Sequence, residues 1–136
     1  MSSFKIFDIA GSGMSAQSVR LNTVASNLAN ADSVSSTPQG VYRARHPVFQ
    51  ALLGGAGDPA SAGVGVAGIV ESPAAAESHY DPGNPLADAQ GYVYAPGVNV
   101  VEEMTDMISA SRSYQNNVEV LSTTRDLLLA TLKLGQ

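Results

Sequence analysis

The C-terminal part of the sequence carries its clearest structural signal. Residues 99–134 read NVVEEMTDMISASRSYQNNVEVLSTTRDLLLATLKL. Asn99 is a favourable helix N-cap, and Glu102 three residues later completes a capping-box pattern. Apolar side chains then recur at spacings of three and four residues, which predicts a long helix over 99–136 with one seam for a partner helix. The expected seam positions are Met104, Met107, Ser111, Tyr114, Val118, Leu121, Arg125, Leu128 and Leu132.

The N-terminal segment carries a second pattern of the same kind. One row of large apolar residues repeats every seven positions, and a row of mostly apolar residues alternates with it. These rows predict a helix over residues 4–31. Gly11 and Gly13 should weaken this helix by about 1 kcal/mol each relative to Ala. The two rows are Phe7, Met14, Leu21 and Leu28, and Ala10, Gln17, Val24 and Ala31.

The segment between these helices has a different composition. Partial alternation predicts short strands over residues 41–53 and 64–71, which could pair as a hairpin around the small residues 54–63. Prolines recur in residues 72–98, so this stretch is expected to be mostly extended and irregular. Within it, Asp81–Pro85 reads DPGNP, which is a strong turn signal.

These elements predict a mainly α fold. The N- and C-terminal helices are expected to pack as an antiparallel coiled-coil-like pair, with a small β-rich and irregular insert between them. Residues 1–32 and 99–136 would form one helical domain, and residues 33–98 the insert. Because a helix pair with a small insert has little interior of its own, other subunits should cover the remaining apolar surface. The residues expected to carry this helix packing and assembly are Leu21, Val24, Asn27, Leu28, Asn30, Met104, Met107, Tyr114, Val118, Leu121, Leu128 and Leu132.

The composition narrows the classes of partner. The net charge is −5 and the 7 Lys and Arg are scattered, which argues against nucleic acid. The chain has no Cys, so disulfides, Cys-based zinc sites and thiol nucleophiles are excluded. No run of about 18 apolar residues is present, so direct membrane insertion is not expected. A secretory signal peptide is not expected either, because Asp8 interrupts the region where its apolar core would lie.

No catalytic or cofactor site is predicted. Glu102 and Glu103 would point about 100° apart on a helix, so they do not face one substrate, and their charge suits the positive end of the helix dipole. His46 and His79 lack the further ligands that a zinc site needs. Gly11–Gly13 lacks the spacing of a phosphate-binding loop. The sequence therefore indicates a protein that is not an enzyme and that has no cofactor, metal or small-molecule substrate.

Asn27 and Asn30 lie close together near the end of the predicted N-terminal helix. Asn is unfavourable inside a helix because its amide competes with the backbone for hydrogen bonds. Two interpretations remain open at this point. Either the helix ends here with Asn30 as a C-cap residue, or the two amides form a polar recognition point at a subunit interface.

The run that contains these two residues, Ala25–Ala31, reads ASNLANA. It resembles the N-terminal signature of the flagellar axial proteins, the family of rod, hook and hook-associated subunits. The C-terminal half is similar to the proximal-rod members of that family. The resemblance covers about residues 4–50 and 80–136, whereas residues 54–79 match no pattern of the family. The C-terminal stretches that carry the likeness are Tyr80–Pro85, Ala87–Ala89, Gly91–Val93, Pro96–Met104, Asp106–Gln115 and Thr131–Gln136.

This resemblance implies a structural subunit of the bacterial flagellar basal-body rod, the periplasmic drive shaft that transmits motor torque. It implies export by the flagellar type III apparatus without a cleaved signal peptide. The partners would be other rod proteins, copies of the chain itself and the export apparatus. The residues alone leave an alternative, in which a soluble helical adaptor or secretion chaperone uses the same amphipathic helices to hold a partner.

Overall fold

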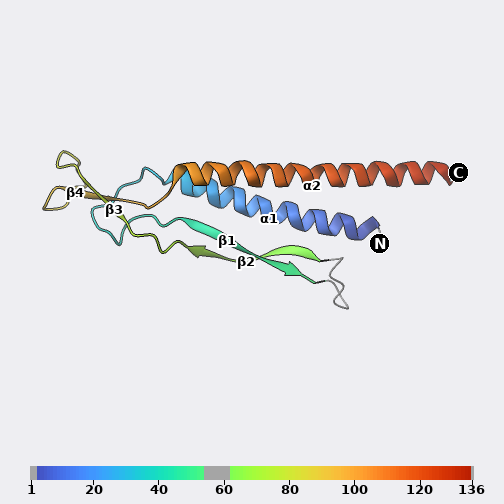
Figure 1. Cartoon of the computed structure of the whole chain (residues 1–136), viewed down its shortest axis with the longest axis horizontal. Helices are drawn as coiled ribbons and strands as arrows, with labels where there is room; N and C mark the ends of the chain where they lie inside the picture. The colour runs from blue at the N-terminus through green and yellow to red at the C-terminus, as the bar shows by residue number, and fades with distance from the viewer. Residues whose placement is uncertain (1–2, 54–61, 136) are drawn as a thin grey trace.

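The computed structural model describes residues 3–53 and 62–135. They form two long terminal helices and two small antiparallel sheets between them (Figure 1), which confirms the predicted order of elements. The two termini lie at the same end of the elongated molecule, and the second sheet lies at the opposite end (Figure 1). The elements are α1 (Ser3–Ala29), β1 (Arg45–Leu52), β2 (Gly63–Glu71), β3 (Glu77–Tyr80), β4 (Tyr92–Ala95) and α2 (Val100–Leu134).

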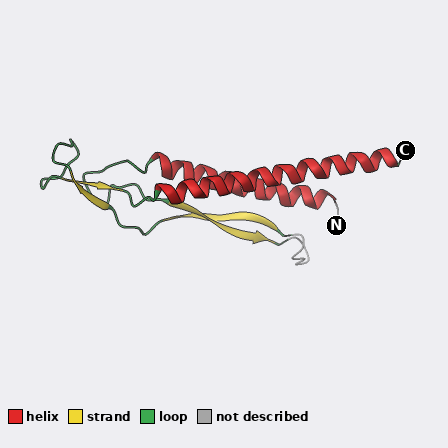
Figure 2. Cartoon of the chain, turned by 45° about the horizontal axis from the view of Figure 1, so that its top comes forward, coloured by secondary structure: helices red, strands yellow, loops and turns green. Residues whose placement is uncertain are grey.

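The two helices lie side by side over most of α1, as two views agree (Figures 1 and 2). Near the end of α1, the Arg20 guanidinium donates to Asp106 Oδ1 over 2.7 Å. Further toward the start of α1, the missing side chain of Gly13 makes room for Asn117. Helix α1 also contacts both strands of the β1–β2 hairpin, so it is the central element of the molecule.

The interior between these elements is built mainly from small side chains. Ala10, Ala16 and Val24 of α1 are almost fully buried, and Ala110 of α2 has no exposed surface. Small residues bring helices close together, but each buries little apolar area. Because burial stabilises by roughly 25 cal/mol per Å², each of these residues contributes little to stability. The fold therefore has a thin core, and many of its large apolar side chains remain at the surface.

The predicted hairpin is confirmed by the pairing of β1 with β2. The register runs from Arg45 opposite Glu71 to Leu52 opposite Gly63, with a shift between Val48 and Phe49. Strand β1 begins at Arg45 rather than at residue 41. Most of the predicted loop at 54–63 lies outside the described residues.

A hydroxyl on α1 fixes the hairpin to the helix. Ser12 Oγ accepts a hydrogen bond from the Val64 backbone N–H over 3.1 Å. Opposite it stands Gly63, where a Cβ would lie only 2.9 Å from the same Ser12 Oγ. A side chain at this position would displace the Ser12 hydroxyl, so the close approach of the strand to the helix favours glycine here.

The expectation that residues 72–98 are mostly irregular is wrong in part. Strands β3 and β4 pair antiparallel, with Glu77 opposite Ala95 and Tyr80 opposite Tyr92. Each strand has only four residues, which is too short to show a period-two pattern. The two strands are also separated in the sequence by a loop that contains prolines. The predicted turn within that loop is confirmed, because the Asn84 N–H donates to the Asp81 carbonyl over 3.1 Å.

The predicted start of the C-terminal helix is also confirmed. Asn99 Oδ1 accepts from the backbone N–H groups of Val101 and Glu102 over 3.1 and 3.3 Å. Lys133 lies in the last turn, where its charge complements the negative end of the helix dipole. Gly135 ends the helix with φ of −90°, so this position does not need the left-handed conformation that favours glycine.

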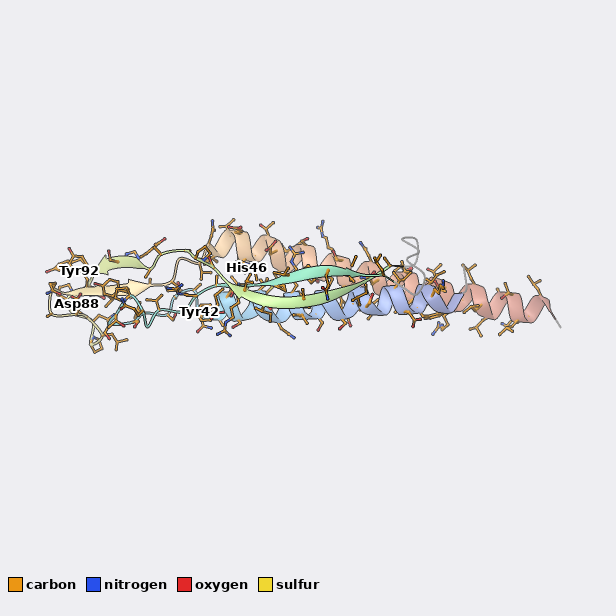
Figure 3. All side chains as sticks on the ribbon, turned by 90° about the horizontal axis from the view of Figure 1, so that it is seen from below. Tyr42, His46, Asp88 and Tyr92 are labelled. Carbon is orange, nitrogen blue, oxygen red and sulfur yellow. The ribbon has the colours of Figure 1, made fainter. Side chains whose placement is uncertain are left out.

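Asp88 holds the loop of the β3–β4 lobe together. Its Oδ1 accepts from the N–H groups of Gln90 and Tyr92, both over 2.9 Å, and its Oδ2 accepts from the Tyr94 hydroxyl over 3.1 Å. These bonds, first of all that from the Tyr92 N–H, lower the pKa of the Asp88 carboxyl. The same carboxylate raises the pKa of the Tyr94 hydroxyl. Asp88 and Tyr92 lie within the lobe, at the end remote from the chain termini (Figure 3).

We expect the lobe to lose order as the pH falls through the lowered pKa of Asp88. A carboxyl with a lower pKa in the folded state stabilises the fold above its unfolded pKa, and protonation removes that contribution. The NMR shifts of the Tyr94 ring, followed from about pH 6 to about pH 2, should change with a midpoint below about 3.9. Asp88→Asn should abolish this titration. A wild-type midpoint above that value, or an unchanged curve in the variant, would contradict the assignment.

The two glycines of α1 should respond oppositely to a methyl group. A Cβ at Gly11 meets no atom within 4 Å, so Gly11→Ala should stabilise the fold by about 1 kcal/mol through helix propensity. A Cβ at Gly13 would lie 2.8 Å from Asn117 Nδ2, so Gly13→Ala should gain less or destabilise. Urea unfolding followed by helical circular dichroism measures both. Equal gains in the two variants would show that α1 and α2 are not closely packed at Gly13.

Candidate functional site

The most distinctive polar cluster lies where the end of α1 meets β1 and the start of α2. We call it the Asn27 junction, formed by Asn27, Tyr42, Arg45 and Glu103. The Asn27 side chain has no exposed surface. Its Nδ2 donates to the Arg45 carbonyl over 2.9 Å and to Glu103 Oε2 over 3.0 Å. Its Oδ1 accepts from the Tyr42 hydroxyl over 2.8 Å and from the Arg45 N–H over 2.9 Å.

These four bonds use the full capacity of an amide side chain, which has two donors and two acceptor lone pairs. A buried amide with all its bonds made is stabilising, whereas an unpaired group in the same place costs about 1–3 kcal/mol. Asn27 therefore joins three segments that are far apart in the sequence. Its geometry is that of a structural junction and not of a catalytic centre.

Tyr42 lies at one side of the Asn27 junction and contacts three of its neighbours. Since its hydroxyl donates to Asn27, it accepts from Ser26 Oγ over 3.1 Å. The Arg45 guanidinium lies 5.9 Å from the centre of the Tyr42 ring, within the range of a cation–π contact. Tyr42 is placed where the helices meet the β3–β4 lobe (Figure 3).

Glu103 is the residue whose role sequence reasoning missed. The charge of this residue was expected only to complement the helix dipole, but the side chain is 4% exposed and bonds to Asn27. Nothing local in the sequence indicates this contact, because the two residues are 76 positions apart. The useful signal would have been an acidic residue in the first turn of α2 at a position that faces the other helix.

The structure separates the two interpretations of the Asn pair. Asn30 follows the last residue of α1, and its Nδ2 donates to the Ser26 carbonyl over 2.8 Å, so it ends the helix. Asn27 acts inside the chain. Because its side chain is completely buried, it is not available for direct polar contact with another subunit.

The seam of α1 lies close to its predicted place. Val24 and Ala10 are buried, while Leu21 and Leu28 are half-buried. Gln17 occupies a seam position, and its Oε1 is buried without a hydrogen-bond partner among the described residues.

On α2, two rows of side chains are buried or half-buried. Met107, Tyr114, Leu121 and Leu128, which are predicted seam positions, are half-buried. The second row lies one residue earlier than the predicted Met104, Ser111, Val118, Arg125 and Leu132. Small and polar residues form it: Glu103 bonds to Asn27, Ala110 is fully buried, Asn117 lies beside Gly13, and Thr124 lines a cavity of about 170 Å³ with Ile6.

The predicted positions that do not face α1 lie on a different face of α2. Met104, Val118 and Leu132 are 55%, 42% and 68% exposed. Val101, Ile108 and Leu129 are exposed beside them. Together with the polar residues between them they repeat at spacings of three and four, which places them along one side of the helix. We call this row the α2 outer stripe: Val101, Met104, Ile108, Ser111, Gln115, Val118, Ser122, Arg125, Leu129 and Leu132.

Neither a metal site nor a helix that could span a membrane is found in the part of the chain that the structure describes. Within residues 3–53 and 62–135, no three His, Asp or Glu side chains come together as a metal site would need. None of the helices that the structure describes is sufficiently long and apolar to span a bilayer.

Comparisons with known proteins bear on these features directly. Residues 7–35 match the family described as "Flagella basal body rod protein", and residues 89–134 match "Flagellar basal body rod FlgEFG protein C-terminal". The "Flagellar basal-body rod protein FlgC" of Escherichia coli O157:H7 is 56% identical over 136 residues, which cover 100% of both chains. That of Salmonella typhimurium is 55% identical over the same full length.

The chain belongs to the FlgC family of flagellar basal-body rod proteins. A more distant relative of the same name, from Aquifex aeolicus, is 44% identical over 98% of this chain and 97% of its own. Family membership confirms the predicted resemblance and a structural role in the rod. It also confirms that the chain is not an enzyme, because its relatives are named as rod proteins. As a rod-family protein, it assembles with other rod components of the basal body.

We expect Asn27→Ala to lower the free energy of unfolding by about 3 kcal/mol, because Glu103, Tyr42 and the Arg45 backbone would lose their buried partner. Asn22→Ala is the matched control, since Asn22 is exposed on the same helix and should change stability by about 0.5 kcal/mol or less. Urea unfolding of the purified chains measures both. Similar values for the two variants would mean that the junction does not hold the fold together.

Proposed function

We propose that this rod protein polymerises through its terminal helices into the periplasmic drive shaft that transmits motor torque. The observation that carries the proposal is the α2 outer stripe, where large apolar side chains face solvent along the length of a helix. Monomeric proteins rarely expose several large apolar side chains along one side of a helix, so a stripe of this kind marks a surface that another molecule covers. Stiffness under torque would come from many such helix contacts repeated between copies.

The building block of this assembly is an antiparallel helix pair, with residues 1–32 and 99–136 as one helical domain and residues 33–98 as an insert outside it. The pairing of early α2 residues with late α1 residues supports this arrangement, as in the Asn27–Glu103 contact. The location of both termini at one end of the molecule also supports it (Figure 1). The hairpin would brace α1, because Ser12 bonds to Val64 and Asn27 bonds to Arg45.

The proposal includes export by the flagellar type III apparatus without a cleaved signal peptide, followed by assembly in the periplasm. A chain without Cys and with a thin core of small residues is suited to transport in an unfolded state. Its partners would be other rod proteins, copies of itself and the export apparatus. Nucleic acid, small-molecule substrates and direct membrane insertion have no part in this function.

We expect Met104→Asp to prevent rod assembly while leaving the chain folded. The side chain is 55% exposed, so the carboxylate is tolerated in the single chain, but assembly would bury it in an apolar contact. Thr105→Asp is the matched control, because it adds the same charge at the adjacent, exposed position on a different side of α2.

The measurement is swimming of a deletion strain that carries each variant, with electron microscopy of its basal bodies and circular dichroism of the purified chain. The expected result is truncated rods for Met104→Asp and normal rods for Thr105→Asp. Complete rods and normal swimming with Met104→Asp would contradict assembly through the α2 outer stripe.

A further inference from the structure

Helix α1 also has an outward stripe, and its chemistry differs from that of α2. Its members are exposed, are mostly small, and follow one another at spacings of three and four residues. We call this row the α1 outer stripe: Asp8, Gly11, Ser15, Ser18, Asn22, Ala25 and Ala29. On the helical wheel it lies on the side of α1 away from Asn27 and Arg20, which contact α2.

We propose that the α2 outer stripe of one copy packs antiparallel on the α1 outer stripe of a second copy, with Arg125 opposite Asp8. This inference rests on the proposed assembly through the terminal helices and names the contact that it uses. The occupant of the α2 outer stripe is thus another molecule of the same chain, related by a rotation and a small shift.

The shapes of the two stripes favour this pairing. The α2 outer stripe presents large side chains such as Met104, Ile108 and Val118, and the α1 outer stripe presents residues no larger than Asn. Large side chains of one helix fit into the spaces above small ones, as knobs pack into holes. Two α2 stripes facing each other would set large against large, and two α1 stripes would bury almost nothing.

The pairing also has the symmetry that a rod needs. A contact between two different surfaces of the same chain is heterologous, and repeating it generates an open helical polymer unless the ring closes. Copies related in this way point in one direction along the assembly. The neighbour's α2 therefore runs opposite to α1, as it does in the proposed pair within one chain.

The register follows from charge and polarity. Both stripes alternate spacings of three and four, so the seven members of the α1 stripe match the α2 stripe from Arg125 back to Met104 when Arg125 lies opposite Asp8. In this register every remaining polar position of the α2 stripe up to Arg125 meets a small or polar residue. The further pairs are Gly11 with Ser122, Ser15 with Val118, Ser18 with Gln115, Asn22 with Ser111, Ala25 with Ile108, and Ala29 with Met104.

Shifting the contact by seven residues in either direction is unfavourable. It would set the Asp8 carboxylate against Leu132 or Val118, and a carboxylate in an apolar contact is costly. Asp8 forms no ion pair within residues 3–53 and 62–135, and Arg125 contacts only its neighbour Asp126 over 3.0 Å. Because Arg125 is about two-thirds exposed, it can reorient toward Asp8 of another copy. Such a pair fixes register more than it adds affinity.

Disulfide crosslinking tests this contact directly, because the chain has no Cys of its own. A deletion strain would express two chains together, one with Ser15→Cys and the other with Val118→Cys, and its basal bodies would be isolated and oxidised. We expect a crosslinked dimer of the two chains and none when either variant is expressed alone. Ser15→Cys with Leu132→Cys is the out-of-register control and should give no dimer.

Each outcome separates this inference from the proposed function. Complete rods without the dimer would overturn the contact and leave assembly through the helices standing. Crosslinks between two Val118→Cys chains, or to a different rod protein, would also overturn it. Absence of a rod defect in the deletion strain would instead overturn the proposed function.

A charge exchange provides a second readout that does not depend on added cysteines. Asp8→Arg should place two cations together at the contact and reduce swimming. Adding Arg125→Asp to the same chain should restore swimming, since every contact then again joins one cation to one carboxylate, with the two charges exchanged. Both sites are exposed, so circular dichroism should be unchanged. An undisturbed single variant, or a double variant without rescue, would overturn the register.

Discussion

The arrangement of this chain depends on the burial of one amide. Asn27 has no exposed surface, and its four hydrogen bonds go to Glu103 at the start of α2 and to Tyr42 and the Arg45 backbone at the start of the hairpin. A buried amide tolerates few alternatives, since any displacement of α2 or of β1 would leave polar groups unpaired. The junction therefore fixes how far along α1 the second helix begins and where the hairpin starts. The other buried apolar residues of the two helices are mostly small, such as Ala10, Ala16 and Ala110.

Helix α2 presents different kinds of residue on two different sides. Toward α1 it presents Glu103, Ala110, Asn117 and Thr124, residues that are small enough or polar enough for close approach. Away from α1 it presents the larger apolar residues of the outer stripe. Met107, Tyr114, Leu121 and Leu128 alternate with this row and are half-buried, so the closest approach to α1 is made by small and polar residues while several larger side chains stay exposed. The exposed apolar residues of the outer stripe suit the assembly contact proposed above.

The β elements serve the same arrangement at different distances from the helices. The hairpin is attached along α1 by Ser12 and by the Asn27 junction. The β3–β4 lobe is joined to the segment that follows α1 through the bridge between Ser35 and Tyr94, and Asp88 orders its loop. The lobe exposes aromatic rings such as Tyr80 and contributes little to the helical core.

The sequence by itself determined the two helices, the N-cap at Asn99, the hairpin and the family. These follow from local signals: apolar spacing, a capping residue, turn residues and the ASNLANA run each act over a few neighbouring positions. It also predicted Met107, Tyr114, Leu121 and Leu128 as seam positions, and these side chains are half-buried. Only the tertiary structure decided that Glu103 and Asn27 are partners, that β3 pairs with β4, and that Met104, Val118 and Leu132 face outward. Apolar periodicity alone cannot tell which of two adjacent rows meets the partner in the same chain, because both rows have the same spacing. That choice depends on which side chains are small enough for two backbones to approach, and on a buried hydrogen bond between residues 76 positions apart.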